Sequence, residues 1–261
     1  MAELFQDIRW LHIAAGSVAL ILFWIPVAIS KGGPWHIRIG WTYAACMAVV
    51  VATALSMSGL AFSMPLRVRH FVKPLSADET VQFIRNSREI AFFLGYLGLV
   101  TLAAGWQGIG VLRTRRDPRS FRKTWTYGLN AAVVLAGIVS LTMGIIERAG
   151  VFVGMSSVGF LVGGGNLRYL LRDPESKMHW WYEHLSSMIA TAIAGYTAFL
   201  AFGGTRLFPI LGRGQFHVLL WLAPTLIGGP AISLTIMYYK RKFHENGRAD
   251  KSASTQMKPA V

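Results

Sequence analysis

The chain has 261 residues, of which 53% are hydrophobic and 15% are charged, and its formal net charge is +14. This composition excludes a water-soluble globular protein. The basic residues lie between long apolar runs, so we expect them to set membrane topology and to contact anionic membrane lipids, and we expect no nucleic-acid binding. The single cysteine, Cys46, excludes a disulfide or a thiolate metal site within the chain.

Long, nearly charge-free runs account for most of the sequence. A membrane-spanning helix needs about 20 mostly apolar residues, so the pattern predicts an all-α polytopic bundle of about seven transmembrane helices over residues 1–245. A polar, aperiodic cytoplasmic tail over 246–261 is expected to be disordered. The spans are expected near residues 10–30, 39–61, 90–112, 125–146, 151–171, 178–203 and 216–239.

The first run is expected to remain as a span rather than to be cleaved as a signal peptide. Glu3, Asp7 and Arg9 precede it, so the positive region of a signal peptide is missing. The apolar run is also longer than the apolar part of a signal peptide.

The longest connection, residues 62–89, separates the second and third spans. Ser76 and Glu79 have the spacing of a capping box, which predicts a short helix leading into the third span. Five basic residues in this connection could contact lipid phosphates or a partner, but a solvated or interfacial helix explains them more simply.

Proline and glycine interrupt two spans and enrich a third. Pro26 is expected to kink the first span, and Pro224 and Pro230, with two glycines between them, are expected to kink or break the seventh. A broken span can expose backbone groups to a transported solute. The fifth span contains five glycines and is expected to pack closely against another helix (Gly154, Gly159, Gly163, Gly164, Gly165).

The distribution of Lys and Arg predicts the orientation. Seven spans place the termini on opposite sides, and the connections then divide the basic residues into 17 on one side and 9 on the other. Cytoplasmic loops carry the excess of positive charge. We therefore expect the N-terminus outside and the C-terminus in the cytoplasm.

Ionisable side chains inside apolar runs are costly to bury in lipid and are therefore functional candidates. In this chain they are mostly histidines. His12 and His217 lie near the outer ends of the first and seventh spans. His36 precedes the second span and His184 lies inside the inner end of the sixth. Together they form an outer and an inner layer.

The remaining histidines are weaker candidates. His179 belongs to the inner layer, but it lies four residues before Glu183, and these two side chains are expected to pair. His70 and His244 are expected to be solvated.

Two histidine layers near opposite faces are typical of transmembrane diheme cytochromes, in which imidazoles from facing helices take both axial positions of each iron. We therefore expect His12, His36, His184 and His217 to bind b-type heme and to support electron transfer with a quinone or a redox partner. No metal beyond this iron is expected. Three alternatives stay open: interfacial histidines with no ligand, a bound metal ion, or a quinone head group.

The sequence lacks the residues that several other activities require. The seventh span has no interior lysine for a retinal Schiff base, and HExxH and phosphate-binding motifs are absent. Acidic residues are missing from the middles of the spans, which weakens the case for a proton-coupled transporter.

Gln107, Asn130 and Asn166 are polar residues within the spans, and each could make an interhelical hydrogen bond. The alternative functions are a small-molecule or ion transporter that uses the seventh span, or a non-catalytic membrane partner subunit.

Segments at both ends of the chain resemble the bacterial multi-pass membrane proteins grouped as domain of unknown function family 2306. The segments are LHIAAG at 11–16, HIRIGWTY at 36–43 and EHLSSMIATAIAGYTAF at 183–199, followed by WLAPTLIGG and a basic YYKRKF end. The resemblance covers roughly residues 10–61 and 179–243 and includes His12, His36 and His184. It implies a bacterial inner-membrane location and supplies no established activity.

Overall fold

The structure is a computed structural model that describes residues 1–174, 176–207 and 216–245, with the side chains of Phe216 and His217 excepted. It is 84% helical, and the described residues contain no strand. In chain order the elements are α1 (Ala2–Ala28), α2 (Pro34–Ser63), α3 (Ala77–Arg113), the 3-10 turn η1 (Pro118–Phe121), α4 (Thr124–Ile146), α5 (Gly150–Leu171), α6 (His179–Ala198), the π-helical turn η2 (Phe199–Gly204), α7 (Thr205–Leu207) and α8 (Phe216–Lys242).

Within the described part of the chain, seven helical segments are long and apolar enough to cross a membrane, with α6, η2 and α7 counted as one. Each of the seven predicted spans overlaps one of these segments. The all-α bundle predicted from the sequence is therefore confirmed, and the chain is a multi-pass integral membrane protein. The expected disordered tail over 246–261 lies outside the described residues.

The connection between α2 and α3 is shorter than expected because α3 starts early. The predicted capping box is confirmed: Ser76 Oγ accepts from the Glu79 amide at 3.3 Å, and Glu79 Oε2 accepts from the Ser76 amide at 2.8 Å. The predicted short helix is continuous with the third span, so α3 extends over 37 residues.

The prolines do not interrupt α8, which is helical from Phe216 to Lys242 across Pro224 and Pro230. Of the expected kink or break, a break is therefore absent from the described residues, because a membrane helix can stay helical when neighbouring groups satisfy the backbone that proline frees. The irregular span is the sixth, where the α-helix widens into the π-helical turn η2 at Phe199. This turn was not predicted from the sequence.

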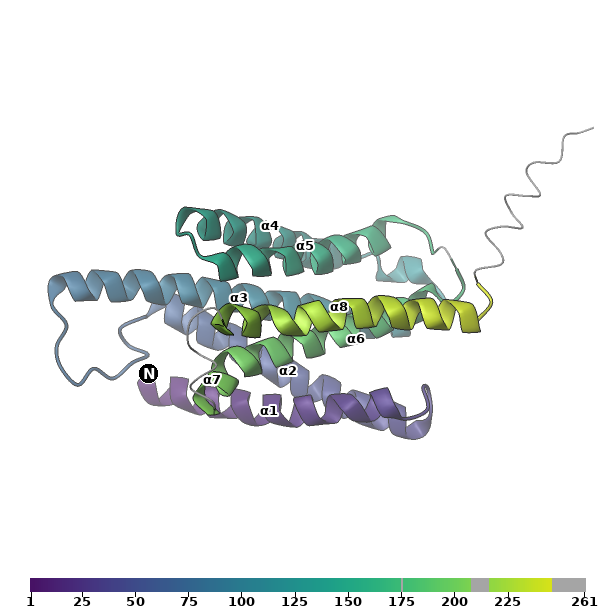
Figure 1. The fold of residues 1–261 in the computed structure, drawn as a ribbon, viewed down its shortest axis with the longest axis horizontal. Helices are drawn as coiled ribbons and strands as arrows, with labels where there is room; N and C mark the ends of the chain where they lie inside the picture. Colours follow the sequence, from purple (N-terminus) through teal and green to yellow (C-terminus); the bar gives the residue numbers. More distant parts are fainter. Residues whose placement is uncertain (175, 208–215, 246–261) are drawn as a thin grey trace, which may run out of the picture.

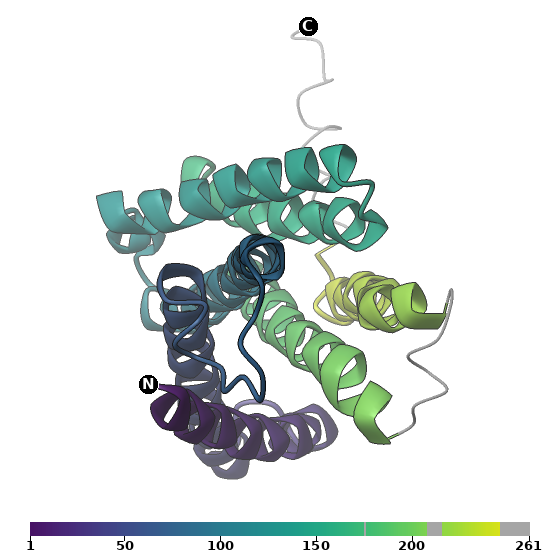
Figure 2. The same ribbon diagram turned by 90° about the vertical axis from the view of Figure 1, so that its left-hand side faces the viewer.

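Helix α3 lies at the centre of the bundle (Figures 1 and 2). It packs on α2, α4, α5 and α6, and it contributes more buried residues than any other helix. The α1–α2 and α4–α5 hairpins lie on opposite sides of it, and α6 and α8 complete the bundle. Because α1 has only two buried residues in its 27, most of its surface is left for lipid.

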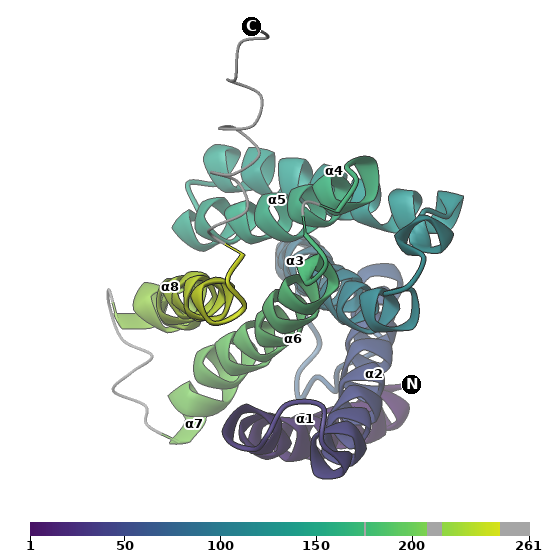
Figure 3. The ribbon, with the colours of Figure 1, turned by 90° about the vertical axis from the view of Figure 1, so that its right-hand side faces the viewer.

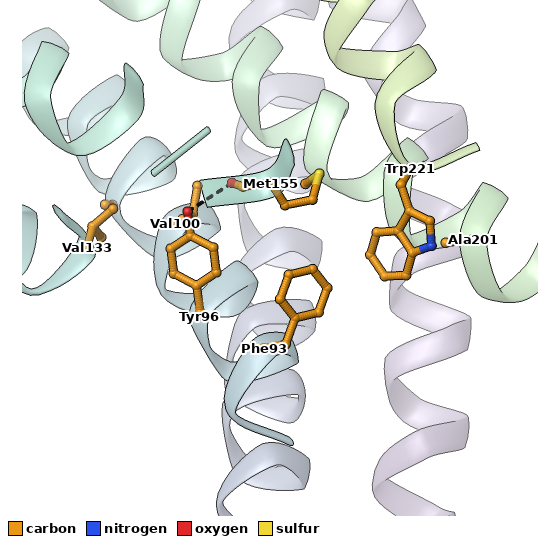
Figure 4. Close-up of a cluster of buried hydrophobic side chains, with 8 residues drawn as sticks. Phe93, Tyr96, Val100, Val133, Met155, Ala201 and Trp221 are labelled. Atoms are coloured by element: carbon orange, nitrogen blue, oxygen red, sulfur yellow. Dashed lines mark hydrogen bonds between the residues drawn. The ribbon is translucent and has the colours of Figure 1, made fainter. Parts of the chain in front are cut away.

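The main apolar cluster joins α3, α4, α5, η2 and α8 (Figure 4). Within it, the Tyr96 hydroxyl donates to the Met155 carbonyl at 3.0 Å and accepts from the Gly159 amide at 2.9 Å. In a regular helix those two α5 groups would bond to each other. Tyr96 of α3 therefore makes interhelical hydrogen bonds with two groups of the α5 backbone.

Glycines of α5 set its distance from α4 and from α3, as expected for the fifth span. A Cβ on Gly163 would lie 3.0 Å from the Asn130 carbonyl and from the side chains of Val133 and Val134. A Cβ on Gly159 would collide with Tyr96. Gly164, in contrast, has no neighbour within 4 Å of such an atom, so only part of the glycine stretch serves close packing.

We predict that Gly163→Val will destabilise the bundle by about 1–3 kcal/mol, because the added atoms must push α4 away from α5. Gly164→Val is the matched control on the next residue and should change the melting temperature much less. Thermal unfolding of the detergent-solubilised variants measures both. Equal losses from the two substitutions would contradict the packing role of Gly163.

Candidate functional site

The inner end of the bundle is the end where α2, α4 and α6 begin and α3 and α5 finish; it lies on the right in Figure 1. His184 lies in the second turn of α6, and its Nδ1 is 2.9 Å from the Gly108 carbonyl oxygen of α3. Because a carbonyl can only accept, Nδ1 must carry the proton and Nε2 keeps its lone pair. Histidines that ligate metals are oriented by the same kind of bond to a backbone carbonyl.

Close contact between α3 and α6 makes this bond possible. A Cβ on Gly108 would lie 2.9 Å from Met188 Sδ and 3.2 Å from Ser187 Cβ, so a larger residue would separate the helices. One turn of α3 away, Gly105 faces Thr191. Small residues at these positions let the α3 backbone reach the imidazole of His184.

The register of α2 against α6 places His36 near His184. The two helices run in the same direction, and Tyr43 of α2 and Thr191 of α6 share a buried hydrogen bond of 2.8 Å. His36 and His184 each lie seven residues before these positions, which is close to two full helical turns on both helices. They therefore lie at the same depth and on matching faces, and they are close enough to interact electrostatically.

The His36 ring has one nitrogen available. The ring lies near the Pro26 carbonyl at the end of α1, and its Nδ1 is buried without a hydrogen-bond partner among the described residues. In the tautomer that carries its proton on Nε2, the lone pair is on Nδ1. Lys31 Nζ donates to the same Pro26 carbonyl at 2.8 Å and to Val27 at 2.6 Å, so it closes the end of α1 beside His36.

His12 of the outer layer is held by α2. Its Nδ1 lies 3.1 Å from the Val50 carbonyl and 2.9 Å from Thr53 Oγ1. The carbonyl again requires a proton on Nδ1, so Nε2 keeps its lone pair, as in His184. Thr53 could not be identified as a partner from the sequence, because a lone threonine in an apolar run gives no sign of which helix it faces.

The structure does not bring His12 and His217 together in the described residues. Phe216 and His217 begin α8, and the His217 side chain lies outside those residues. Helix α1 packs on α2 and α6, whereas α8 packs on α5 and α6. Figure 3 shows α6 between α1 and α8. Pairing of His12 with His217 stays a prediction.

The weaker histidines lie where the sequence predicted. His179 Nε2 is 4.0 Å from Glu183 Oε1, and the His179 ring stacks on Tyr169, so the expected pairing with Glu183 is confirmed. His70 and His244 are exposed.

Two of the three buried amides make the predicted interhelical hydrogen bond. Asn166 Nδ2 of α5 donates to Asn130 Oδ1 of α4 at 2.8 Å and lies 3.4 Å from the Ala103 carbonyl of α3. Gln107 differs: its side chain is fully buried beside Glu183, yet neither amide atom makes a well-formed hydrogen bond with the described residues.

Comparisons of the chain with protein-family models, with curated proteins and with solved structures find no match.

We predict that Thr191→Val will lower stability by about 1–3 kcal/mol, because it leaves the buried Tyr43 hydroxyl without its partner. Thr42→Val is the control: Thr42 lies beside Tyr43 on α2 but is exposed, and among the described residues its hydroxyl bonds only to the Arg38 carbonyl of its own helix. Thermal unfolding should show a clear loss for Thr191→Val and little change for Thr42→Val. Similar melting temperatures for the two would disprove the proposed register contact.

Proposed function

We propose that the chain is a membrane heme protein for electron transfer, in which His36 and His184 hold a b-type heme at the inner end. The main support is their arrangement. Two parallel helices bring both imidazoles to one depth, the Gly108 carbonyl orients the His184 ring, and the buried Nδ1 of His36 has no hydrogen-bond partner among the described residues. The single cysteine cannot supply the thiol pair of covalently attached heme, which favours the b type.

The number of available ligands also favours heme over a bare metal ion. The described residues contain no group of three or more His, Cys, Asp or Glu side chains that could hold a metal ion. Heme requires only two axial ligands from the protein because the macrocycle supplies the others. When bound, heme supplies a one-electron carrier, and a quinone or a redox protein is the proposed exchange partner.

The protein's own residues would orient and shield the ligands. Gly108 fixes the His184 tautomer, and Met188, one turn from His184, packs with Tyr43 and Met47 into an apolar cluster on the outer side of the pair. Apolar packing lowers the local dielectric and limits access of water. His12 and His217 are the proposed ligands of a second heme at the outer end.

A small-solute transporter is the second candidate, and the π-helical turn η2 favours it. Such turns are frequent at functional sites, and this one interrupts a membrane span at Phe199–Gly204.

We also propose, from the motifs at its two ends, that the chain belongs to domain of unknown function family 2306 and to a bacterial inner membrane.

Absorption spectra test the heme proposal. The protein purified from cells supplied with heme should show a sharp Soret band and an α band that appears on reduction. His184→Ala and His36→Ala should lose the low-spin spectrum of the inner heme, because each removes an axial ligand. His179→Ala is the control, since His179 pairs with Glu183 instead. A colourless wild-type protein would rule out heme, and equal losses from His179→Ala and His184→Ala would mean that these histidines are structural.

Reporter fusions test the proposed orientation. Val72 is fully exposed in the connection between α2 and α3 and offers an insertion point, and Lys242 ends α8. Alkaline phosphatase inserted at Val72 should be active, which requires export, and a fluorescent protein fused after Lys242 should fluoresce in the cytoplasm. The reverse pattern would invert the orientation, and the same compartment for both would contradict seven spans.

A further inference from the structure

Gln107 presents a buried amide whose hydrogen bonds the described protein does not complete. The side chain is 0% exposed, and both Nε2 and Oε1 lack a well-formed partner among the described residues. Leaving such a group unsatisfied costs about 1–3 kcal/mol. Buried waters commonly fill this role and need two to four polar partners.

A second unsatisfied group lies at the same end of the bundle. Thr126, near the start of α4, is 0% exposed, and its Oγ1 also lacks a partner in the described part of the chain. The Thr126 carbonyl accepts from Asn130 at 2.9 Å, and Asn130 accepts from Asn166. Asn166 in turn faces Ala103, one turn of α3 from Gln107. Hydrogen-bonded polar groups therefore extend from the backbone of Thr126 to α3, one turn from Gln107.

Glu183 connects this path to the surface. Its carboxylate lies beside Gln107, and Arg168 and His179 also face it. The Glu183 side chain is 25% exposed, whereas Gln107 is fully buried. Polar groups therefore continue from the partly exposed Glu183, near the start of α6, to the fully buried Gln107.

We propose that the inner ends of α3, α4, α5 and α6 enclose a water-filled vestibule that opens beside Glu183 and ends at Gln107 and Thr126. Its ligand is water, because amide, hydroxyl and carboxylate groups together offer both donors and acceptors. On α3 and on α6 the vestibule residue adjoins a residue of the histidine site: Gln107 precedes Gly108, and Glu183 precedes His184. Adjacent residues point about 100° apart on a helix, so the vestibule lies on a different face from the histidine pair. It does not depend on heme binding.

Cysteine labelling tests the proposal, because the natural chain has a single cysteine. In a Cys46→Ser background, Gln107→Cys is treated in lipid nanodiscs with the water-soluble reagent methanethiosulfonate ethylammonium. Only a thiol that water reaches can form the reactive thiolate, so we expect modification at least about tenfold faster than at a dry buried position.

Val111→Cys is the matched control. Val111 is also 0% exposed and lies one turn nearer to the same end of α3, but it packs in an apolar cluster with Phe121, Tyr169 and Leu170. Faster labelling of Gln107→Cys than of Val111→Cys supports the vestibule, because depth alone would give the opposite order. Equal, slow labelling of both overturns it.

Gln107→Leu gives an answer if the cysteine variant does not fold. If waters satisfy the amide, leucine removes their hydrogen-bond partner and leaves them between an apolar side chain and Glu183. The melting temperature then falls. If the amide lies unsatisfied in a dry site, leucine removes a buried polar group and the melting temperature rises, which overturns the proposal.

Discussion

The contact between α3 and α6 at Gly108 is the constraint on which the inner end of the molecule depends. With no side chain at this position, the α3 backbone comes close enough for its carbonyl to bond His184. The same contact places Gln107 beside Glu183 on the neighbouring face. In lipid, small residues at helix interfaces are a main source of tight association, because apolar side chains gain little by leaving lipid for protein. One glycine therefore orients two different groups of polar side chains.

The sequence predicted the number and approximate position of the spans because membrane thickness sets the length of an apolar run. It also predicted the capping box at Ser76, which is a local pattern. It could not predict which way each helix faces. Lipid and bundle core are both apolar, so the spans lack the polar stripe that orients a helix in a soluble protein. The partners of His12 and His184, Thr53 of α2 and Gly108 of α3, are therefore visible only once the helices are packed.

Interactions between residues distant in sequence decide how the histidines pair and where the spans become irregular. Tyr43 and Thr191 are 148 residues apart, yet their hydrogen bond fixes the depth at which His36 faces His184. The sequence placed both histidines at inner span ends but gave no reason to pair them. It indicated a kink or a break at Pro224 and Pro230, where α8 remains helical, and gave no sign of the π-helical turn at Phe199. Proline marks a possible break, whereas a π-helical turn depends on packing around it.

Tyr96 has a consequence for how the chain enters the membrane. Helix α5 is the least apolar of the seven spans and α4 the most apolar, and a connection of only three residues joins them. Tyr96 of α3 adds hydrogen bonds to the α5 backbone at Met155 and Gly159, and an isolated α5 helix lacks these bonds. Insertion of α5 into lipid is thus expected to draw on both neighbours in turn: α4 carries it in as a hairpin, and docking on α3 then adds these hydrogen bonds.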